Sequence, residues 1–356
     1  MTKLKTIFVG ISGGVDSSVA AYLLKQQGYD VQGIFVKTWS PDWLPCTWVD
    51  EKRDAMRICA ELGIRFHFLD ASEEYKQGVA DYMISEYQAG RTPNPDVLCN
   101  KVIKFGAMWQ YAKAYGAEGI ATGHYAQVEN GVLKKAIDPA KDQAYFLWMV
   151  EKELLQSIYF PIGHLKKSEV REIAEKVGLF TATKKDSQGI CFLGEVDMKE
   201  FLLHYIDQKS GPVINEQGIV IGDHDGIYFY TLGERHGFRI TEKNTSRTPY
   251  YIVAKNIETN TLTVATSPKD STNIIGTVTL SLRDTNWMIT PKIDTAYTAQ
   301  IRYHGALLEA ILSNDHTITL TTDEPIPLGQ SLVLYDGETV IGGGVIEAVV
   351  QSQLYE

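Results

Sequence analysis

The stretch Gly10-Ile11-Ser12-Gly13-Gly14-Val15-Asp16-Ser17-Ser18 lies where a strand is expected to pass into a helix. Residues 6–9, just before it, are apolar and rich in β-branched side chains, which is typical of a buried strand. The residues from Val19 to Leu24 include apolar side chains at helical spacing, and Gly28 marks the end of that helix. Such a turn directs backbone N–H groups and the positive end of a helix toward one point, where an anionic phosphate can bind.

The glycines and serines of this stretch suit a phosphate site. Gly13 and Gly14 let the backbone approach a ligand without a Cβ in the way, and Ser12, Ser17 and Ser18 add hydroxyl donors. The stretch is neither a Walker loop nor the dinucleotide-binding fingerprint, because it lacks both Gly-x-x-x-x-Gly-Lys-[Ser/Thr] and Gly-x-Gly-x-x-Gly. From the residues alone, an ordinary glycine-rich turn between strand and helix stays open as an alternative.

The segment Ser12-Gly-Gly-Val-Asp16-Ser17 resembles the pyrophosphatase loop (PP-loop) of enzymes that use ATP to adenylate an oxygen and release pyrophosphate. The resemblance implies ATP as the nucleotide and Mg²⁺ as its companion ion. Asp16 would help to hold that Mg²⁺, because a carboxylate is a hard ligand for a hard cation.

The bulk composition sets limits on the class of protein. A chain of 356 residues is long enough for two or three domains, and 44% hydrophobic with 22% charged residues is ordinary for a globular protein. A net charge of -10 argues against unspecific coating of nucleic acid but allows a local basic surface. The four cysteines do not have the spacing of a disulfide framework, and no apolar stretch approaches a membrane span. We therefore expect a cytoplasmic protein with no membrane partner.

The first 207 residues alternate between strand and helix patterns. Apolar runs at 31–37, 64–69 and 119–125 predict further strands of a parallel sheet, and the fold class is therefore α/β. Helical periodicity covers residues 50–63, 75–87, 101–116 and 168–178. Two prolines within residues 90–100 predict a shaped loop there. Cys59 and His67 lie on predicted core faces and are expected to be structural.

From about residue 208 the helical periodicity gives way to short β-like runs. The sequence predicts a small β-rich central domain over 208–270 and a C-terminal domain over 271–356, after an N-terminal domain over 1–207. Regular short strands in the last part are typical of a barrel or a sandwich. These strands are expected at 275–282, 296–303, 306–312, 316–322, 331–335 and 340–349.

Three stretches together resemble one family, the tRNA-specific 2-thiouridylases. They are the loop at 10–18, the run Asn94-Pro95-Asp96-Val-Leu-Cys99-Asn100, and the run Ser187-Gln-Gly-Ile-Cys191-Phe192. The resemblance covers nearly the whole chain in order. It implies an N-terminal PP-loop domain of the adenine nucleotide alpha hydrolase type, a β-rich central domain and a C-terminal β-barrel.

The activity implied by the resemblance is ATP-dependent sulfur transfer to tRNA. ATP would adenylate the C2 oxygen of the wobble uridine, in tRNAs of the Lys, Glu and Gln type, and sulfur would then replace that oxygen. Cys99 would be the nucleophile and Cys191 the persulfide carrier, in a sequence that ends with a disulfide between them. Because only a thiolate attacks, both are expected in water-accessible, polarised surroundings, and two lysines lie upstream of Cys191. A persulfide donor or carrier protein is the implied partner, and a monomer is expected.

The same resemblance implies further site residues. Gly10, Ile11, Ser12, Gly13, Gly14, Val15, Asp16, Ser17, Val36 and Gly123 would bind ATP; Asn94, Pro95 and Asp96 would meet the target base; and His124, Lys141, Asp142, Gln143, Arg302, Tyr303 and Gln330 would contact tRNA. A flipped-out wobble base is the expected way to expose its C2 edge. Arg302 and Tyr303 suit phosphate contact and base stacking.

Some features depart from the family pattern or leave other readings open. The family commonly has another basic residue where this chain has His304, and no role is assigned to Cys46. An amide-forming PP-loop synthetase is the alternative enzyme class, and an ATP-sensing tRNA-binding module is the alternative outside enzymes. Both would leave the pair Cys99 and Cys191 without a purpose. No bound metal is predicted, although an iron–sulfur cluster held by these cysteines and a third ligand stays open.

Overall fold

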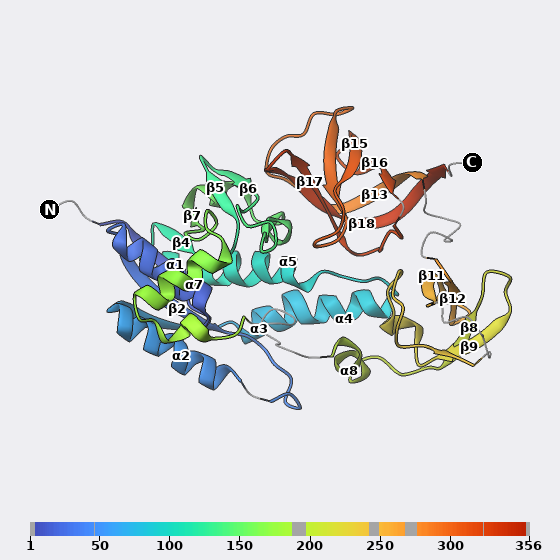
Figure 1. Cartoon of the computed structure of the whole chain (residues 1–356), viewed down its shortest axis with the longest axis horizontal. Helices are drawn as coiled ribbons and strands as arrows, with labels where there is room; N and C mark the ends of the chain where they lie inside the picture. The colour runs from blue at the N-terminus through green and yellow to red at the C-terminus, as the bar shows by residue number, and fades with distance from the viewer. Residues whose placement is uncertain are drawn as a thin grey trace.

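The structure is a computed structural model that describes residues 4–45, 47–186, 197–241, 249–267, 276–322 and 324–353. Cys46 and Cys191 lie outside the described residues, as does the run around Cys191 on which part of the family resemblance rests. The predicted α/β class is confirmed, with β-rich parts following the N-terminal domain (Figure 1).

The N-terminal domain is built on a five-stranded sheet in the order β3-β2-β1-β4-β7, and every printed pairing is parallel. β1 lies in the middle, with Ile7 paired to Val31 on one side and to Gly119 on the other. The chain therefore moves outward through β2 and β3 and then returns to the opposite side of β1. In open α/β sheets, ligands bind outside the carboxyl ends of the two strands at such a reversal, here β1 and β4. The strands are β1 Thr6–Gly10, β2 Asp30–Lys37, β3 Arg65–Asp70, β4 Gly119–Ala121 and β7 Ile158–Tyr159.

Helices cover both faces of this sheet. Side chains alternate along a strand, so Ile7 and Val9 of β1 pack with one helical layer while Phe8 packs with the other. The first layer is α1 Val15–Gln26, α2 Trp48–Leu62 and α7 Lys167–Lys176. The second layer is α3 Ser72–Tyr75, the π-helix η1 Lys76–Ala80, α4 Asp81–Gln88, α5 Pro95–Cys99, the π-helix η2 Asn100–Ala107 and α6 Met108–Ala114.

The prediction of a loop throughout residues 90–100 is wrong at its end, because α5 begins at Pro95. Proline is tolerated at the first position of a helix, where its missing N–H has no intrahelical partner to lose. Asn94 caps this helix, accepting a hydrogen bond at Oδ1 from the N–H of Val97 at 3.4 Å. Cys99 is therefore the last residue of a capped helical turn, and not a loop residue.

The central part forms a second five-stranded sheet in the order β10-β9-β8-β12-β11. Its strands are antiparallel except for β12 and β8, which pair in parallel. The strands are β8 Gly211–Ile214, β9 Val220–His224, β10 Arg239–Ile240, β11 Tyr251–Asn256 and β12 Thr261–Ala265. Short helical segments connect the parts of the chain: η3 Ala144–Leu147, η4 Lys152–Ser157, η5 Phe180–Thr183, α8 Met198–Leu203 and η6 Ile227–Phe229.

The C-terminal part is a closed antiparallel barrel. Its sheet runs β13-β16-β15-β14-β17-β18, and an additional pairing of β13 with β18 closes the ring. The inward side chains, among them Val278, Leu280 and Leu320, are fully or almost fully buried. The barrel predicted from the spacing of short apolar runs is confirmed. Its strands are β13 Gly276–Trp287, β14 Ala296–Gln300, β15 Leu308–Asn314, β16 Thr317–Thr322, β17 Ser331–Asp336 and β18 Thr339–Gln353.

The barrel and the N-terminal domain are directly joined (Figure 1). The hairpin of β5 Gln127–Glu129 and β6 Val132–Lys134 extends the barrel sheet, because Lys134 pairs with Thr339 of β18. The amide side chain of Asn286 in β13 donates to the carbonyl oxygens of Trp148 and Val150 at 2.6 and 3.0 Å. The domain boundaries at 207/208 and 270/271 stay predictions.

Candidate functional site

The glycine-rich loop lies at the carboxyl end of β1, as the sequence indicates. Gly13 has a φ of +80°, a conformation that favours glycine, and a Cβ there would approach Asp54 Cβ to 3.1 Å. The Ser12 N–H donates to Ser17 Oγ at 3.2 Å, while the hydroxyl of Ser18 donates to the Gly14 carbonyl at 2.7 Å. The loop is therefore held in shape by its own serines, with the first turn of α1 directly behind it.

Gly123 approaches this loop from the end of β4. A Cβ at Gly123 would lie 2.7 Å from the backbone nitrogen of Ser17 and 2.8 Å from the carbonyl carbon of Asp16. Only a glycine fits such an approach without moving the backbone. The structure thus brings Gly123 and the loop, which are far apart in the sequence, together at the carboxyl ends of β1 and β4. Val36, also predicted to contact ATP, is buried near the end of β2.

Two residues that the sequence analysis missed bind the Asp16 carboxylate. The Tyr125 hydroxyl donates to Asp16 Oδ1 at 2.9 Å, and Lys167 Nζ lies 2.8 Å from each carboxylate oxygen. Burial, with the Asp16 charge next, raises the pKa of Tyr125 well above its ordinary value. Tyr125 directly follows Gly123 and His124, so its position after the second glycine turn could have indicated that it belongs to the site. Lys167 lies at the start of a helix far away in the sequence, and nothing in the sequence around it indicates a contact with Asp16.

A second carboxylate, that of Asp186, forms ion pairs with three cationic side chains, and it shares one of them, Lys167, with Asp16. Lys141, Lys167 and Arg171 reach it at 2.9, 2.8 and 2.7 Å. Burial opposes the ionisation of Asp186, but hydrogen bonds and charge from Lys167 and Lys141 outweigh it and lower its pKa to about 2. Asp186 is therefore ionised at neutral pH and anchors the chain at this point, five residues before Cys191.

The Asn94 to Cys99 segment forms a second part of the site. Cys99 is fully buried, so the expectation that it is water-accessible is wrong for this structure. The reason is its place at the end of α5, whose apolar side packs in the same core as Phe8 and Met108. Pro95 and Asp96 form the first turn of that helix, and Asn94 caps it.

A short chain of contacts joins the Cys99 segment to the loop. Lys104 lies on η2, which follows Cys99, and its Nζ is 3.1 Å from His124 Nε2. Burial, followed by the Lys104 charge, holds the pKa of His124 well below its usual range. A neutral His124 accepts from Lys104 at Nε2 and donates from Nδ1 to Thr122 Oγ1 at 2.7 Å. Next to them, Gly123 lies against the loop.

Several residues that are predicted to contact tRNA are buried or have polar groups that already bind other residues of this protein. His124 is buried, and Lys141 is paired with Asp186. Asp142 accepts from the N–H groups of Ala136 and Ala144, and burial raises its pKa. The Gln143 side chain accepts from the Tyr125 N–H at 3.0 Å. Residues 141–143 thus hold the segment that supports Tyr125.

The barrel residues of the predicted tRNA set differ among themselves. Arg302 donates to the carbonyl oxygens of Leu232 and Pro325 at 3.1 and 3.0 Å, so it ties the barrel to the central part. Gln330 donates to the carbonyls of Thr92 and Pro93 and so orders the chain just before Asn94. Tyr303 is 37% exposed, and its ring centroid lies 4.3 Å from that of Phe146 and 3.9 Å from that of His304. Next to it, His304 has a φ of +56°.

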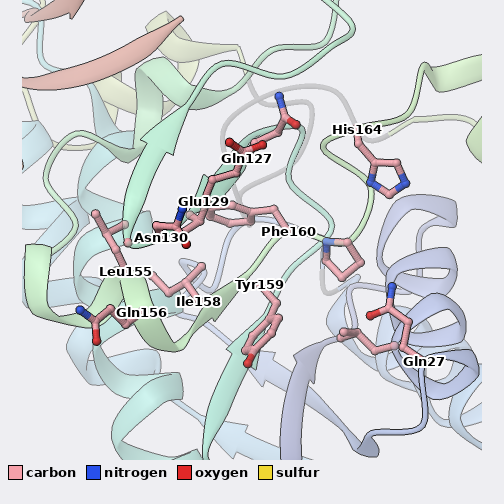
Figure 2. Close-up of a pocket in the computed structure, with 14 residues that line it drawn as sticks. Gln27, Gln127, Glu129, Asn130, Leu155, Gln156, Ile158, Tyr159, Phe160 and His164 are labelled. Carbon is pink, nitrogen blue, oxygen red and sulfur yellow. The ribbon is translucent and has the colours of Figure 1, made fainter.

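One cavity lies at the joint between the N-terminal domain and the barrel, and another lies within the N-terminal domain. The first, of about 310 Å³, contains Asp142, Tyr145, Tyr303 and His304, and thus includes residues predicted to contact tRNA. The other, of about 560 Å³, lies between the end of α1, the β5–β6 hairpin and β7, with amide side chains such as Gln27 and Asn130 around it (Figure 2). This larger cavity contains none of the predicted site residues.

A parallel sheet with a serine- and glycine-rich loop at its reversal point, joined to a buried cysteine, defines an ATP-using enzyme of the PP-loop class. The family models that match are described as tRNA methyl transferase HUP domain over residues 5–195, tRNA methyl transferase PRC-barrel domain over 199–266 and Aminomethyltransferase beta-barrel domain over 277–346. Relatives named tRNA-specific 2-thiouridylase MnmA match over almost the full length, and the chain belongs to this family.

These relatives come from several bacteria. The protein from Lysinibacillus sphaericus is 43% identical, with 97% of this chain and 95% of the relative covered. The protein from Geobacillus thermodenitrificans is 42% identical over the same shares, and the one from Pseudomonas fluorescens is 42% identical over 97% of this chain and 96% of its own.

Two features are absent from the residues that the structure describes. Among them there is no helix with the length and apolar character that a membrane crossing requires. Within the same ranges, His, Cys, Asp and Glu side chains do not gather in threes in a way that could hold a metal ion.

Proposed function

We propose that this protein converts the wobble uridine of tRNA to 2-thiouridine, using ATP to activate the base and a persulfide to supply the sulfur. Support comes from its membership of the 2-thiouridylase family over nearly its whole length. It also comes from the loop at residues 10–18, whose backbone and following helix suit a phosphate. The proposed substrates are tRNAs of the Lys, Glu and Gln type.

The proposed chemistry has two stages. First, the C2 oxygen of uridine attacks the α-phosphorus of ATP, the bond to pyrophosphate breaks, and the base carries AMP. Then the terminal sulfur of a Cys191 persulfide attacks C2 and expels AMP. Finally the thiolate of Cys99 attacks the Cys191 sulfur, which releases the 2-thio base and leaves a disulfide between the two cysteines. An external reductant must then restore both thiols.

Asn94, Pro95 and Asp96 are proposed to meet the target base, because they open the helix that ends at Cys99. Since Cys99 is fully buried, its attack requires that base binding uncovers it. Tyr303 is proposed as the stacking residue for the tRNA, on the ground of its exposed ring. For Arg302 and Gln330 we propose an indirect contribution, through the connecting segments that their hydrogen bonds hold in place.

We propose that Asp16 helps to hold the magnesium ion that accompanies ATP, in place of the Lys167 ammonium that contacts both of its carboxylate oxygens in this structure. Mg²⁺ is commonly held by one or two carboxylates together with substrate phosphates and water, and Asp16 would supply the carboxylate. When bound, the ion would neutralise part of the phosphate charge. The part of Tyr125 is to hold Asp16 in place through its hydroxyl. We further propose a cytoplasmic monomer that receives sulfur from a donor or carrier protein, because free thiols at Cys99 and Cys191 require a reducing compartment.

The test uses purified full-length protein, tRNA, ATP and a radiolabelled persulfide donor, with label followed on protein and tRNA. Cys191→Ser should lose thiolation and carry no labelled sulfur, because a hydroxyl cannot form a persulfide. Cys99→Ser should lose thiolation yet retain label on Cys191. The reverse pattern would exchange the two roles, and full thiolation by either variant would reject the two-cysteine scheme.

A cellular measurement tests the substrate itself. Mass spectrometry of tRNA nucleosides from cells that lack this chain should show loss of 2-thiouridine derivatives at the wobble position only. Unchanged 2-thiouridine levels, with pyrophosphate release that depends on glutamine or ammonia, would favour the amide-forming class instead.

A further inference from the structure

Lys167, the first residue of α7, is bound by two carboxylates at once. Its ammonium lies 2.8 Å from both oxygens of Asp16 and 2.8 Å from Asp186 Oδ1. A lysine ammonium has three donors, so these three oxygens match its full capacity. The side chain is only 13% exposed, which makes this a partly desolvated and therefore stronger set of ion pairs than a surface pair.

Neither carboxylate depends on Lys167 alone. Asp16 also accepts from the Tyr125 hydroxyl, and Asp186 is bound by Lys141 and Arg171. When the ammonium moves, Asp186 therefore keeps two cations, and Asp16 keeps the Tyr125 hydroxyl as a hydrogen-bond donor. Such a lysine is suited to exchange one anion for another.

The position of Lys167 identifies the incoming anion. Asp16 lies in the first turn of α1, directly behind the loop at residues 10–14. A polyphosphate bound at that helix start would bring negative charge beside Asp16, and the Lys167 ammonium is already in contact there. We propose that Lys167 binds the β- and γ-phosphates of ATP, and then the leaving pyrophosphate, by exchanging contacts with Asp16 for contacts with phosphate oxygens. This assignment rests on the proposed use of ATP at this loop.

The neighbouring cations are less suited to this exchange. Arg171 donates to the carbonyls of Ala182 and Lys184 as well as to Asp186, which fixes its guanidinium. Lys184 is the rival, since it reaches the Gly13 carbonyl at 3.0 Å and Asp54 at 2.6 Å. However, Lys184 is the one side-chain donor to the Asp54 carboxylate within the described residues, whereas Asp16 keeps the Tyr125 hydroxyl when Lys167 moves away.

The experiment is calorimetric titration of the full chain with inorganic pyrophosphate and, separately, with AMP, both in the presence of Mg²⁺. Lys167→Gln should weaken pyrophosphate binding by about 10- to 100-fold, the loss expected for a hydrogen bond between charged groups. AMP binding should change by less than about twofold, because AMP carries neither the β- nor the γ-phosphate. Lys166→Gln, an exposed neighbour, is the matched control and should leave both affinities unchanged. Lys167→Arg should recover much of the pyrophosphate affinity.

Other outcomes would overturn the assignment. Equal losses for pyrophosphate and AMP would make Lys167 a structural tether, and a larger selective loss in Lys184→Gln would transfer the role to Lys184. If Lys167→Gln does not fold, Tyr125→Phe carries the test: with its hydroxyl donor gone, Asp16 holds Lys167 more tightly, and pyrophosphate should bind several-fold more weakly. Unchanged pyrophosphate affinity in that variant would refute the exchange.

The two proposals fail separately. Wild-type protein that binds pyrophosphate but does not thiolate tRNA would refute the proposed function alone. Active thiolation together with normal pyrophosphate affinity in Lys167→Gln would refute the Lys167 assignment alone.

Discussion

Glu86 is expected to be the most sensitive charged residue at the joint between the N-terminal domain and the barrel. It lies on α4, is 4% exposed, and receives Arg91 Nε at 2.7 Å and Arg283 Nη2 at 2.6 Å. Arg283 belongs to β13 of the barrel, and Arg91 lies three residues before Asn94. One carboxylate thus ties the barrel and the segment leading to Asn94 to the same helix.

We expect Glu86→Gln to lower the free energy of unfolding by about 1–3 kcal/mol. Removal of one partner from a fully buried ion pair costs about 3–5 kcal/mol, because the remaining charge stays unpaired. The arginine side chains here are 35% and 26% exposed, so water compensates for part of that loss. Chemical denaturation measures the change, and Glu61→Gln, which breaks the surface pair with Arg57, is the control with an expected loss below about 0.5 kcal/mol.

The pH dependence gives a second, independent readout. Burial opposes the ionisation of Glu86, but the hydrogen bonds of Arg91 and the charge of Arg283 outweigh it and hold its pKa below the ordinary value. A depressed pKa contributes stability above the pKa of the unfolded chain, about 4.3, and that stability is lost as the pH falls through the folded value. The difference between wild type and Glu86→Gln should therefore be complete at pH 7 and shrink below about pH 4.5. A difference no larger than that of Glu61→Gln, or one independent of pH, would refute the reasoning.

Further expectations concern the loop and the tRNA surface. Asp16→Ala should abolish pyrophosphate release from ATP in the presence of tRNA while the circular dichroism spectrum stays that of the wild type; continued turnover would show that the loop is misassigned. In Gly123→Ala the new methyl group should push the backbone of Asp16 and Ser17 away from residue 123, which should lower the free energy of unfolding by about 1–3 kcal/mol. Titration should then show ATP affinity reduced by at least tenfold, and an unchanged affinity would contradict the close approach. Because the chain is acidic, tRNA affinity should fall with salt with a modest log–log slope, about -2 to -4, and a flat response would mean few phosphate contacts.

The sequence predicts much of this architecture because strong local patterns decide it. The buried strand at residues 6–9, the loop and the following helix agree with one another, so the start of the parallel sheet follows from periodicity and glycine placement. The barrel strands follow from short alternating runs separated by turn residues. Both features are determined by residues that are close together in the sequence, and hydrophobic periodicity and turn residues report on such local structure.

The errors have physical reasons that lie outside local patterns. Two prolines indicate a break in a helix, yet one of them, Pro95, begins α5 because a helix does not need an N–H at that position. The burial of Cys99 depends on which side of that helix packs against the sheet. Lys167 could not be found, because Asp16 meets it across 151 residues of sequence. Likewise, periodicity gives no sign that Lys141 pairs with Asp186.

The β5–β6 hairpin has a consequence for any attempt to produce the ATP-binding part alone. The hairpin belongs to the N-terminal domain by sequence but continues the barrel sheet through Lys134 and Thr339, and the Lys135 N–H donates to the Glu338 carbonyl. A truncation after residue 207 would strip this hairpin of its neighbour strand and expose backbone donors and acceptors along its edge. Exposed edges of this kind template pairing with other chains. A shortened protein should therefore express as aggregates, so the useful unit for crystallisation and for assays is the full chain.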